Sequence, residues 1–438
     1  LIHYFVDEWE RGAFEHARGV LADAGWPVGS LAFDPEAFTL GLCFDLELGN
    51  LVKATRFGYV VRAQHGDEVL SFDEQRTIYA GTVVELGDER FEFMNTLFEL
   101  SRASLWTQLV SVHDRTPLPG VTSYAHLYRE IDRALAAAHL EGALKAAIVE
   151  DPQRFVDLDP GIVATLRDQR LAGKQLLLVT NSEWSYTRRM MSWCFDELMP
   201  DGDTWRDLFD LVVVAAAKPR FFAEVGPVYR VVDEERGLLE PHWGELRPGD
   251  VYHGGNAGMV EEALGHDPSQ FLYVGDHLFG DVHVTKDVLR WRTCLIAREL
   301  EAEIEAAAAF AHDEVRLREM MTDKTALEAA HARARMTRRR LVVAEADRAD
   351  ADAEIERLAG AIAAVDREIA PLARAATEQG NAVWGPLMRA GVDKSLFARQ
   401  VEKYADVYTS RVSNFADATP YAYLRAARGT LPHDRVGR

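Results

Sequence analysis

Residues 272–281 read Leu-Tyr-Val-Gly-Asp-His-Leu-Phe-Gly-Asp, and this stretch indicates the fold class. Its apolar start has the pattern of a buried strand, and two carboxylates, Asp276 and Asp281, follow it beside glycines. Crowded carboxylates repel each other and lose solvation unless a cation or backbone amides compensate them. Mg²⁺ suits this position because it takes few protein oxygens and leaves room for water and phosphate. We therefore predict a Mg²⁺ site formed by Asp276 and Asp281.

Further apolar runs on both sides of this stretch predict a parallel sheet. They lie at 175–179, 211–214, 250–253 and 292–296, beside the run 270–274 that begins the stretch itself, and helix-like segments separate all five. Strands that alternate with helices form a parallel sheet covered on both faces. In such a sheet, ligands bind outside the carboxyl ends of the strands. The sequence thus predicts an α/β fold whose functional residues directly follow its strands.

Polar side chains stand at two more of these strand ends. Thr180, Asn181 and Ser182 follow the run 175–179, and Lys218 comes shortly after 211–214. Hydroxyl and amide groups can hold phosphoryl oxygens there, and a lysine can neutralise a phosphate. Each signal has an ordinary alternative, because Thr, Asn and Ser also cap helices and most lysines are solvated. Their meeting at one sheet edge favours a phosphate site.

Composition limits the class of partner. The 438 residues include 49 Lys and Arg against 70 Asp and Glu, which gives a formal charge of -21. So acidic a surface repels polyphosphate and argues against nucleic acid as a partner. No apolar run reaches the length of a membrane span. Cys43, Cys194 and Cys294 lie in apolar surroundings and are predicted to be buried thiols of a reducing, cytoplasmic compartment.

The chain divides into five expected parts. They are the N-terminal part of the core (1–40), a cap with its connections (41–160), the main core (161–298), a helical arm (299–375) and a C-terminal helical segment packed on the core or cap (376–438). The arm is rich in Ala, Glu and Arg, and the chain has no Gly or Pro between Gly280 and Gly360, which predicts long helices. Such an arm fits a homo-oligomer contact or a surface hairpin without a partner.

Several strings of residues together carry a resemblance to a known family. They are Phe44-Asp45, Gly49-Asn50-Leu51-Val52-Lys53, Asp88-Glu89-Arg90-Phe91, Asn95-Thr96-Leu97-Phe98, Thr180-Asn181-Ser182, Phe209-Asp210-Leu211, Lys218-Pro219, Val251-Tyr252-His253-Gly254-Gly255, residues 275–281, Leu396-Phe397-Ala398, Tyr404-Ala405-Asp406 and Pro420-Tyr421. With these strings the chain resembles the cytosolic purine 5′-nucleotidase family of the haloacid dehalogenase (HAD) superfamily. The resemblance implies a HAD-like Rossmannoid parallel sheet with helices on both faces, an inserted cap and a long helical C-terminal extension.

The resemblance also implies a reaction, the Mg²⁺-dependent hydrolysis of nucleoside 5′-monophosphates. An aspartate attacks phosphorus to form a phospho-aspartyl intermediate, which water then hydrolyses. In this scheme Thr180 and Asn181 hold the transferring phosphoryl group, and Lys218 neutralises nucleophile and phosphate. Asp276 binds the Mg²⁺, and Asp281 supports the metal directly or through water. The family pattern leaves open whether water or a nucleoside accepts the phosphate.

Substrate-binding positions follow from the same resemblance. Phe98 and His139 match the aromatic and the histidine that hold the nucleobase in the family, and Ser182 lies next to the phosphate-binding pair. Core packing for Phe98 and a polar position on an Ala-rich helix for His139 are the alternatives. Ala136 and Leu140 replace an acidic and an aromatic residue of the family. Phe98 and His139 therefore imply a 6-oxopurine base, whereas Ala136 and Leu140 depart from the family's base-binding pattern.

The nucleophile motif of the superfamily, Asp-x-Asp-x-Thr, does not occur where the pattern requires it. In the family this motif directly precedes a stretch like Leu1-Ile2-His3-Tyr4, so we expect the nucleophile just upstream of Leu1. Asp157 and Asp159 stand before Pro160 and Gly161 and are predicted to form a turn. The alternative function is a nucleotide-binding pseudophosphatase or scaffold without turnover.

Two other enzyme classes have weaker support. Gly254-Gly255-x-x-Gly258 loosely imitates a dinucleotide-binding fingerprint, but its first glycine is misplaced. A zinc hydrolase would use His277 and His283, whose spacing does not place both on one helical face. Oxygen ligands favour a hard cation instead.

Overall fold

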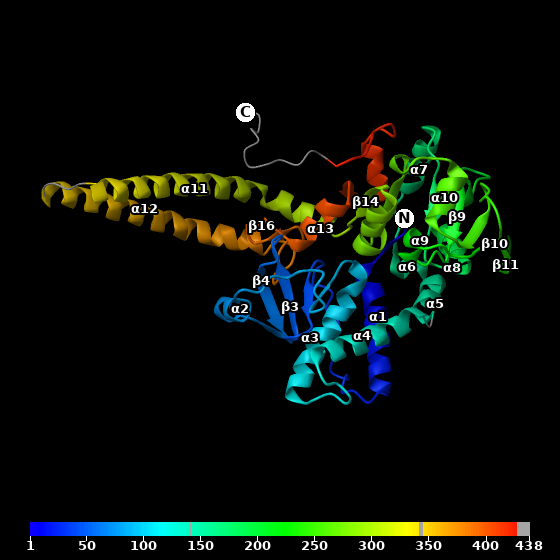
Figure 1. Ribbon diagram of the computed structural model, residues 1–438, viewed down its shortest axis with the longest axis horizontal. Helices are drawn as coiled ribbons and strands as arrows, with labels where there is room; N and C mark the ends of the chain where they lie inside the picture. Colours follow the sequence, from blue (N-terminus) through cyan, green and yellow to red (C-terminus); the bar gives the residue numbers. More distant parts are fainter. Residues whose placement is uncertain (141, 341–344, 427–438) are drawn as a thin grey trace.

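The computed structural model describes residues 1–140, 142–340 and 345–426. It shows an α/β core, a cap beside it and a long pair of helices that projects from the body (Figure 1). Among the described residues, no helix combines the length and the apolar composition needed to cross a bilayer. Cys43, Cys194 and Cys294 are buried free thiols, as predicted.

The core contains two groups of parallel strands. The first group has the order β11-β10-β12-β9-β8, and the second has the order β13-β14-β17. Their bounds are β8 (Leu177–Val179), β9 (Leu211–Val214), β10 (Val228–Asp233), β11 (Leu238–Pro241), β12 (Val251–Gly254), β13 (Leu272–Gly275), β14 (Arg292–Ile296) and β17 (Val407–Thr409). Pairing is parallel within β8-β9-β12 and within β13-β14-β17, whereas β10 and β11 form an antiparallel edge. The predicted parallel sheet is confirmed.

Helices cover both faces of this sheet, as the predicted α/β fold requires. In β9, Val212 and Val214 belong to one apolar cluster, while Leu211 and Val213 belong to another. Successive strand residues point to opposite faces, so each face packs under its own layer. The covering helices are α7 (Ile162–Leu171), α8 (Trp184–Phe195), α9 (Arg220–Ala223) and α10 (Ala257–Leu264).

The cap combines an antiparallel sheet with a helical layer. The sheet has the order β5-β4-β3-β2-β6. Its strands are β2 (Cys43–Asp45), β3 (Asn50–Ala54), β4 (Val60–His65), β5 (Glu68–Val69) and β6 (Phe91–Phe93). The helices of this half of the chain are α1 (Val6–Asp23), α2 (Phe72–Ile78), α3 (Leu100–Arg115), α4 (Tyr124–Leu140), α5 (Ala143–Glu150) and α6 (Pro152–Phe155).

The sequence analysis assigned residues 1–40 to the core, but most of this segment packs in the cap. Phe14 and Leu21 of α1 lie in one apolar cluster with Phe44 of β2, Trp106 of α3 and Leu127 of α4. The helix α1 therefore belongs to the cap, and only the first few residues of the chain lie with the core. An amphipathic helix shows which of its faces is buried but not which layer buries it.

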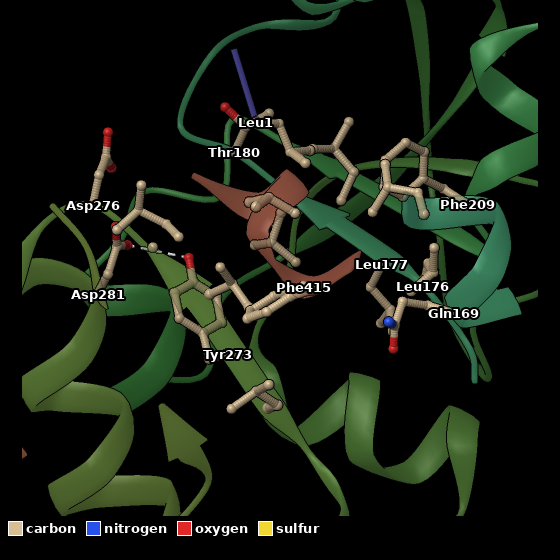
Figure 2. Close-up of a pocket in the computed structure, with 18 of the residues that line it drawn as sticks. Leu1, Gln169, Leu176, Leu177, Thr180, Phe209, Tyr273, Asp276, Asp281 and Phe415 are labelled. Atoms are coloured by element: carbon tan, nitrogen blue, oxygen red, sulfur yellow. Dashed lines mark hydrogen bonds between the residues drawn. The ribbon is translucent and has the colours of Figure 1, made fainter. Parts of the chain in front are cut away.

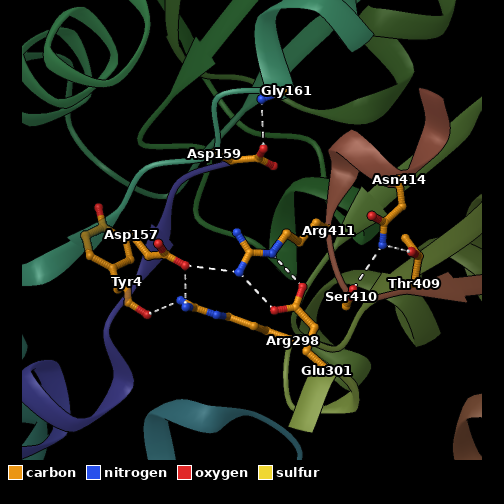
Figure 3. A network of polar contacts seen from close by, with 10 residues as sticks. All are labelled: Tyr4, Asp157, Asp159, Gly161, Arg298, Glu301, Thr409, Ser410, Arg411 and Asn414. Atoms are coloured by element: carbon orange, nitrogen blue, oxygen red, sulfur yellow. Dashed lines mark hydrogen bonds and ion pairs between the residues drawn. The ribbon is translucent and has the colours of Figure 1, made fainter. Parts of the chain in front are cut away.

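Two short strands connect the core to the cap. β1 (His3–Tyr4) and β7 (Val156–Asp157) pair antiparallel, so the two crossings lie side by side. Arg298 donates to the Tyr4 carbonyl at 2.8 Å and to the Asp157 carboxylate at 2.5 Å. Arg411 binds the same Asp157 at 3.1 Å and Glu301 at 2.5 Å (Figure 3). This ionic cluster ties the crossing to the base of the arm and to the C-terminal part.

The arm is a hairpin of two long helices, as predicted. They are α11 (Leu300–Arg340) and α12 (Glu345–Thr377), and ion pairs such as Lys324–Asp366, at 2.6 Å, join them. The C-terminal part contains β15 (Arg389–Ala390), β16 (Asp393–Lys394) and α13 (Leu396–Tyr404). It then supplies β17 to the core sheet, a strand that the sequence did not predict.

A fully buried carboxylate holds the cap sheet together. Asp45 accepts two hydrogen bonds from the Arg90 guanidinium, at 2.9 and 2.7 Å, and one from the Tyr79 hydroxyl at 2.9 Å. Arg90 also pairs with Glu47 at 3.3 Å, but the Glu47 side chain is 68% exposed whereas that of Asp45 is 0% exposed. The two carboxylates thus share one arginine, but only Asp45 is buried and also accepts from the Tyr79 hydroxyl.

Asp45→Ala should therefore lower the free energy of unfolding far more than Glu47→Ala. Removing one partner of a buried ion pair costs about 3–5 kcal/mol. Losing the exposed pair costs at most about 1 kcal/mol. Urea denaturation of both variants beside the wild type checks this, and equal losses would contradict it.

A second prediction concerns pH. Glu10 lies fully buried in α1, and burial raises the pKa of its carboxyl to about 7. Because the folded state holds this proton up to higher pH than the unfolded state, stability falls as pH rises from about 4.5 to 7. Glu10→Gln removes this loss, so its stability relative to the wild type should increase by about 2–3 kcal/mol between pH 5 and pH 8. Urea denaturation of the wild type and of Glu10→Gln at both pH values measures this difference, with Glu15→Gln, which changes an exposed carboxylate on the same helix, as the control.

Candidate active site

A cavity of about 820 Å³ extends along β8 and β13 to the loops that follow β8, β9 and β13. Thr180 and Ser182, after β8, line it, together with Lys218 from the loop after β9 and Asp276 and Asp281 after β13. Figure 2 shows Thr180, Asp276 and Asp281 around this hollow, close to Leu1. Parallel pairing brings the ends of β8 and β9 to one edge of their sheet, and the cavity lining places the end of β13 beside them. The structure therefore gathers five of the eight candidate side chains along one wall.

The Lys218 ammonium is held by two partners inside the cavity. Its Nζ lies 2.9 Å from Asp281 Oδ1 and donates to the Tyr273 hydroxyl, also at 2.9 Å. The loop that carries it places Ala215 and Ala217 at positive φ, 46° and 59°, and the Lys218–Pro219 peptide bond is cis. The positive φ of Ala215 and Ala217 is uncommon for residues other than glycine, and such backbone conformations cluster at functional sites.

Asn181 supports that loop from behind the cavity wall. Its Oδ1 accepts from the Lys218 backbone N–H at 2.6 Å, and its Nδ2 donates to the Lys218 carbonyl at 3.1 Å. The side chain is exposed and is not among the residues that line the cavity. The amide oxygen and one amide N–H thus place Lys218, and the expected contact of Asn181 with a phosphoryl group stays a prediction.

The two carboxylates of the opening stretch have different surroundings. Asp281 is buried; its Oδ1 accepts from Lys218 and Tyr273, and its Oδ2 accepts from the His277 N–H at 3.3 Å. Asp276 is exposed toward the cavity, and within the described ranges no hydrogen bond or ion pair occupies it. Asp276 is thus the carboxylate that remains available to a ligand.

The donor set fits Mg²⁺ better than zinc. In the part of the chain that the structure describes, no three or more His, Cys, Asp or Glu side chains are grouped to hold a metal. Mg²⁺ needs only one or two carboxylates beside water and phosphate oxygens, which Asp276 and Asp281 can provide. His283 pairs with Asp287 at 2.9 Å, and His277 Nδ1 accepts from the Gly280 N–H at 3.0 Å. Both histidines are thus engaged outside any shared zinc site.

The candidate base-binding residues come from the cap. Phe98 lines the cavity from the cap side, and its ring meets that of Trp9 edge-on with centroids 5.2 Å apart. His139 lies in α4, and its side chain is outside the described part of the structure. Phe98 therefore packs against Trp9 and also lines the cavity, so its position is compatible both with core packing and with contact to a nucleobase.

A family model of 5′ nucleotidases matches residues 1–436. The chain belongs to the 5′-nucleotidase family. It is also 24% identical, over 415 residues, to a 5′-nucleotidase domain-containing protein of Dictyostelium discoideum. That match covers 92% of this chain and 65% of the relative, so the chain spans just under two thirds of the curated relative's length.

This 5′-nucleotidase family member has two further cavity residues that the sequence did not single out. Tyr273 lies within the strand β13, and Glu299 follows β14. Burial, and to a smaller extent the charge of Asp276, raise the pKa of Glu299 to about 7. The rule that functional side chains follow strands could have found Glu299. A tyrosine inside an apolar strand gives no such signal.

Gly275 allows Asp281 to fold back against β13. A Cβ at this position would lie 2.6 Å from Asp281 Oδ2, closer than real contacts allow. Gly275→Ala should therefore displace the carboxylate and lower the free energy of unfolding by about 1–3 kcal/mol. Gly19→Ala on the exposed face of α1 has open space and should stabilise the protein by up to about 1 kcal/mol. Chemical denaturation compares the two, and a neutral Gly275→Ala would contradict the close packing.

Proposed function

We propose that this protein is a Mg²⁺-dependent phosphohydrolase that releases phosphate from nucleoside 5′-monophosphates. The observation that supports this most strongly is the meeting of Thr180, Lys218 and Asp276 at one cavity in a chain of the 5′-nucleotidase family. A hydroxyl, an ammonium and a free carboxylate suit a phosphoryl group and its counter-ion. The family alone supports a phosphatase-type activity, and these residues support the finer assignment.

Each side chain has a distinct task in this proposal. Thr180 and Ser182 bind phosphoryl oxygens through their hydroxyl groups at the end of β8, because the Thr180 N–H donates to the Val213 carbonyl and the Ser182 N–H donates to Thr180 Oγ1. Lys218 offsets the negative charge that gathers on the phosphate, in a site where water is partly excluded. Asp276, with Asp281 nearby, holds Mg²⁺, which would neutralise phosphate charge when bound. Asn181 acts on the reaction indirectly, by fixing the Lys218 loop.

The sheet itself supports the proposal that an aspartate nucleophile comes from a separate strand. β8 and β13 border the cavity, and among the residues that the structure describes no strand pairs with either of them on the side that faces it. Their residues are mostly half-buried, whereas those of the neighbouring strand β9 are fully buried. One further parallel strand between them would satisfy both edges and join the two groups into a single sheet.

A segment directly before Leu1 is the proposed source of that strand. Leu1 lines the cavity, as do Asp276 and Lys218. A strand running parallel to β8 and ending at Leu1 would present its last residues beside Thr180. An Asp-x-Asp-x-Thr sequence there would place a nucleophilic carboxylate where phosphate binds.

The substrate side of the proposal rests on the cap. Phe98 offers an aromatic surface for stacking a nucleobase above the phosphate site. His139 is proposed from family resemblance as its partner, with a 6-oxopurine as the favoured base. Buried free thiols agree with a reducing compartment, so we place the activity in the cytoplasm. If the gene lacks Asp-x-Asp-x-Thr before Leu1, nucleotide binding without turnover becomes the better proposal.

The function can be tested with the full-length protein and a panel of purine and pyrimidine nucleoside monophosphates. With Mg²⁺ present, release of inorganic phosphate is expected, and Lys218→Met and Asp276→Asn should each lower kcat at least about a hundredfold. Lys324→Met and Asp323→Asn, which change the same residue types on the arm, should leave kcat unchanged. Full activity in both site variants, or activity with Zn²⁺ but not Mg²⁺, would contradict the assignment.

A further inference from the structure

Tyr273 contacts two groups of the proposed site with a single hydroxyl. The oxygen accepts a hydrogen bond from Lys218 Nζ at 2.9 Å. The O–H donates to Asp281 Oδ1 at 3.1 Å, a contact that Figure 2 shows. Lys218 and Asp281 are themselves 2.9 Å apart. The three side chains thus form a closed triangle of polar contacts at the cavity wall.

Only the tyrosine can complete such a triangle. A lysine ammonium donates and cannot accept, and an ionised carboxylate accepts and cannot donate, whereas a phenol does both. Burial, reinforced by the neighbouring Asp281 charge, raises the pKa of the Tyr273 hydroxyl well above its usual value, so the O–H remains available to donate. The same hydroxyl therefore fixes the direction of both partners.

The ring that carries this hydroxyl is itself held firmly. Phe222 of α9 meets the Tyr273 ring edge-on, with centroids 5.0 Å apart. Since α9 begins directly after Pro219, the helix that follows Lys218 packs onto the ring that orients Lys218. A lysine side chain has a flexible four-carbon stem, so its charge occupies one place only when such contacts restrict it.

We propose that Tyr273 is a positioning residue of the phosphohydrolase reaction, which holds the Lys218 ammonium and the Asp281 carboxylate at fixed places on the cavity wall. This inference rests on the proposed function. In this proposal the main task of Asp281 is to anchor Lys218, because both carboxylate oxygens of Asp281 already accept hydrogen bonds. Asp276 is then the carboxylate that faces the metal and the substrate.

Tyr273→Phe tests the proposal because it keeps the ring and removes only the bridging oxygen. In the full-length protein with Mg²⁺, kcat should fall about tenfold to a hundredfold while KM changes by less than about threefold. The midpoint of thermal unfolding should stay close to that of the wild type, which separates positioning from loss of fold. Tyr252→Phe is the matched control: Tyr252 is buried in β12, its hydroxyl bonds to the Arg247 N–H at 2.8 Å, and it lies outside the cavity.

Binding of inorganic phosphate gives a second measurement that needs no turnover. Calorimetry with Mg²⁺ present should show weaker phosphate binding to Tyr273→Phe than to the wild type. If Tyr273 acts through Lys218, the double variant Tyr273→Phe/Lys218→Met should bind phosphate no more weakly than Lys218→Met alone.

The outcomes separate this inference from the proposed function. An active wild type whose Tyr273→Phe variant keeps kcat within twofold would overturn the role of Tyr273 and leave the function standing. Additive losses in the double variant would overturn the route through Lys218. A wild type without hydrolysis would overturn the function, and the phosphate measurement would then decide alone whether Tyr273 positions Lys218. A wild type that also fails to bind phosphate would overturn both.

Discussion

Parallel pairing in the core is the constraint on which the site depends. β8 pairs with β9, and β13 with β14, in the same direction, and the loops that follow β8, β9 and β13 line one cavity. That cavity receives a hydroxyl from one loop, an ammonium from the next and two carboxylates from a third. Reversing any one strand would send its polar end to the far side of the core. The chemistry of the cavity is thus a consequence of strand direction.

The polar residues at these strand ends depend on one another. Asn181 fixes the backbone on both sides of the Lys218 peptide, and Asp281 and Tyr273 fix its ammonium. Gly275 leaves the space that Asp281 occupies. Because both the backbone and the ammonium of Lys218 are held, its charge needs little reorganisation when a phosphate binds. This is the physical basis of electrostatic preorganisation. The residues around Lys218 therefore contribute to the electrostatics of the site by fixing the position of its ammonium, although not all of them face the cavity.

The cap, the arm and the C-terminal part meet at the crossing between β1 and β7. Asp157 binds two arginines there, Arg298 from the end of the core and Arg411 from the C-terminal part, while Glu301 at the base of α11 binds Arg411 (Figure 3). Partly buried charges joined in a network are better restrained than isolated surface pairs. The position of the cap over the cavity, and with it that of Phe98, depends on this cluster.

The sequence by itself determined the strands at 175–179, 211–214 and 270–274, the long helices of the arm and the polar residues at the strand ends. These features follow from local periodicity and from the chemistry of single residues, which neighbouring positions reveal. Only the tertiary structure decided that α1 packs in the cap, that Val407–Thr409 extends the sheet beside β14, and that Asn181 turns toward the Lys218 backbone. It alone also joined Tyr273, Lys218 and Asp281. Contacts between segments far apart in the chain depend on which surfaces meet after folding, and no local pattern encodes them.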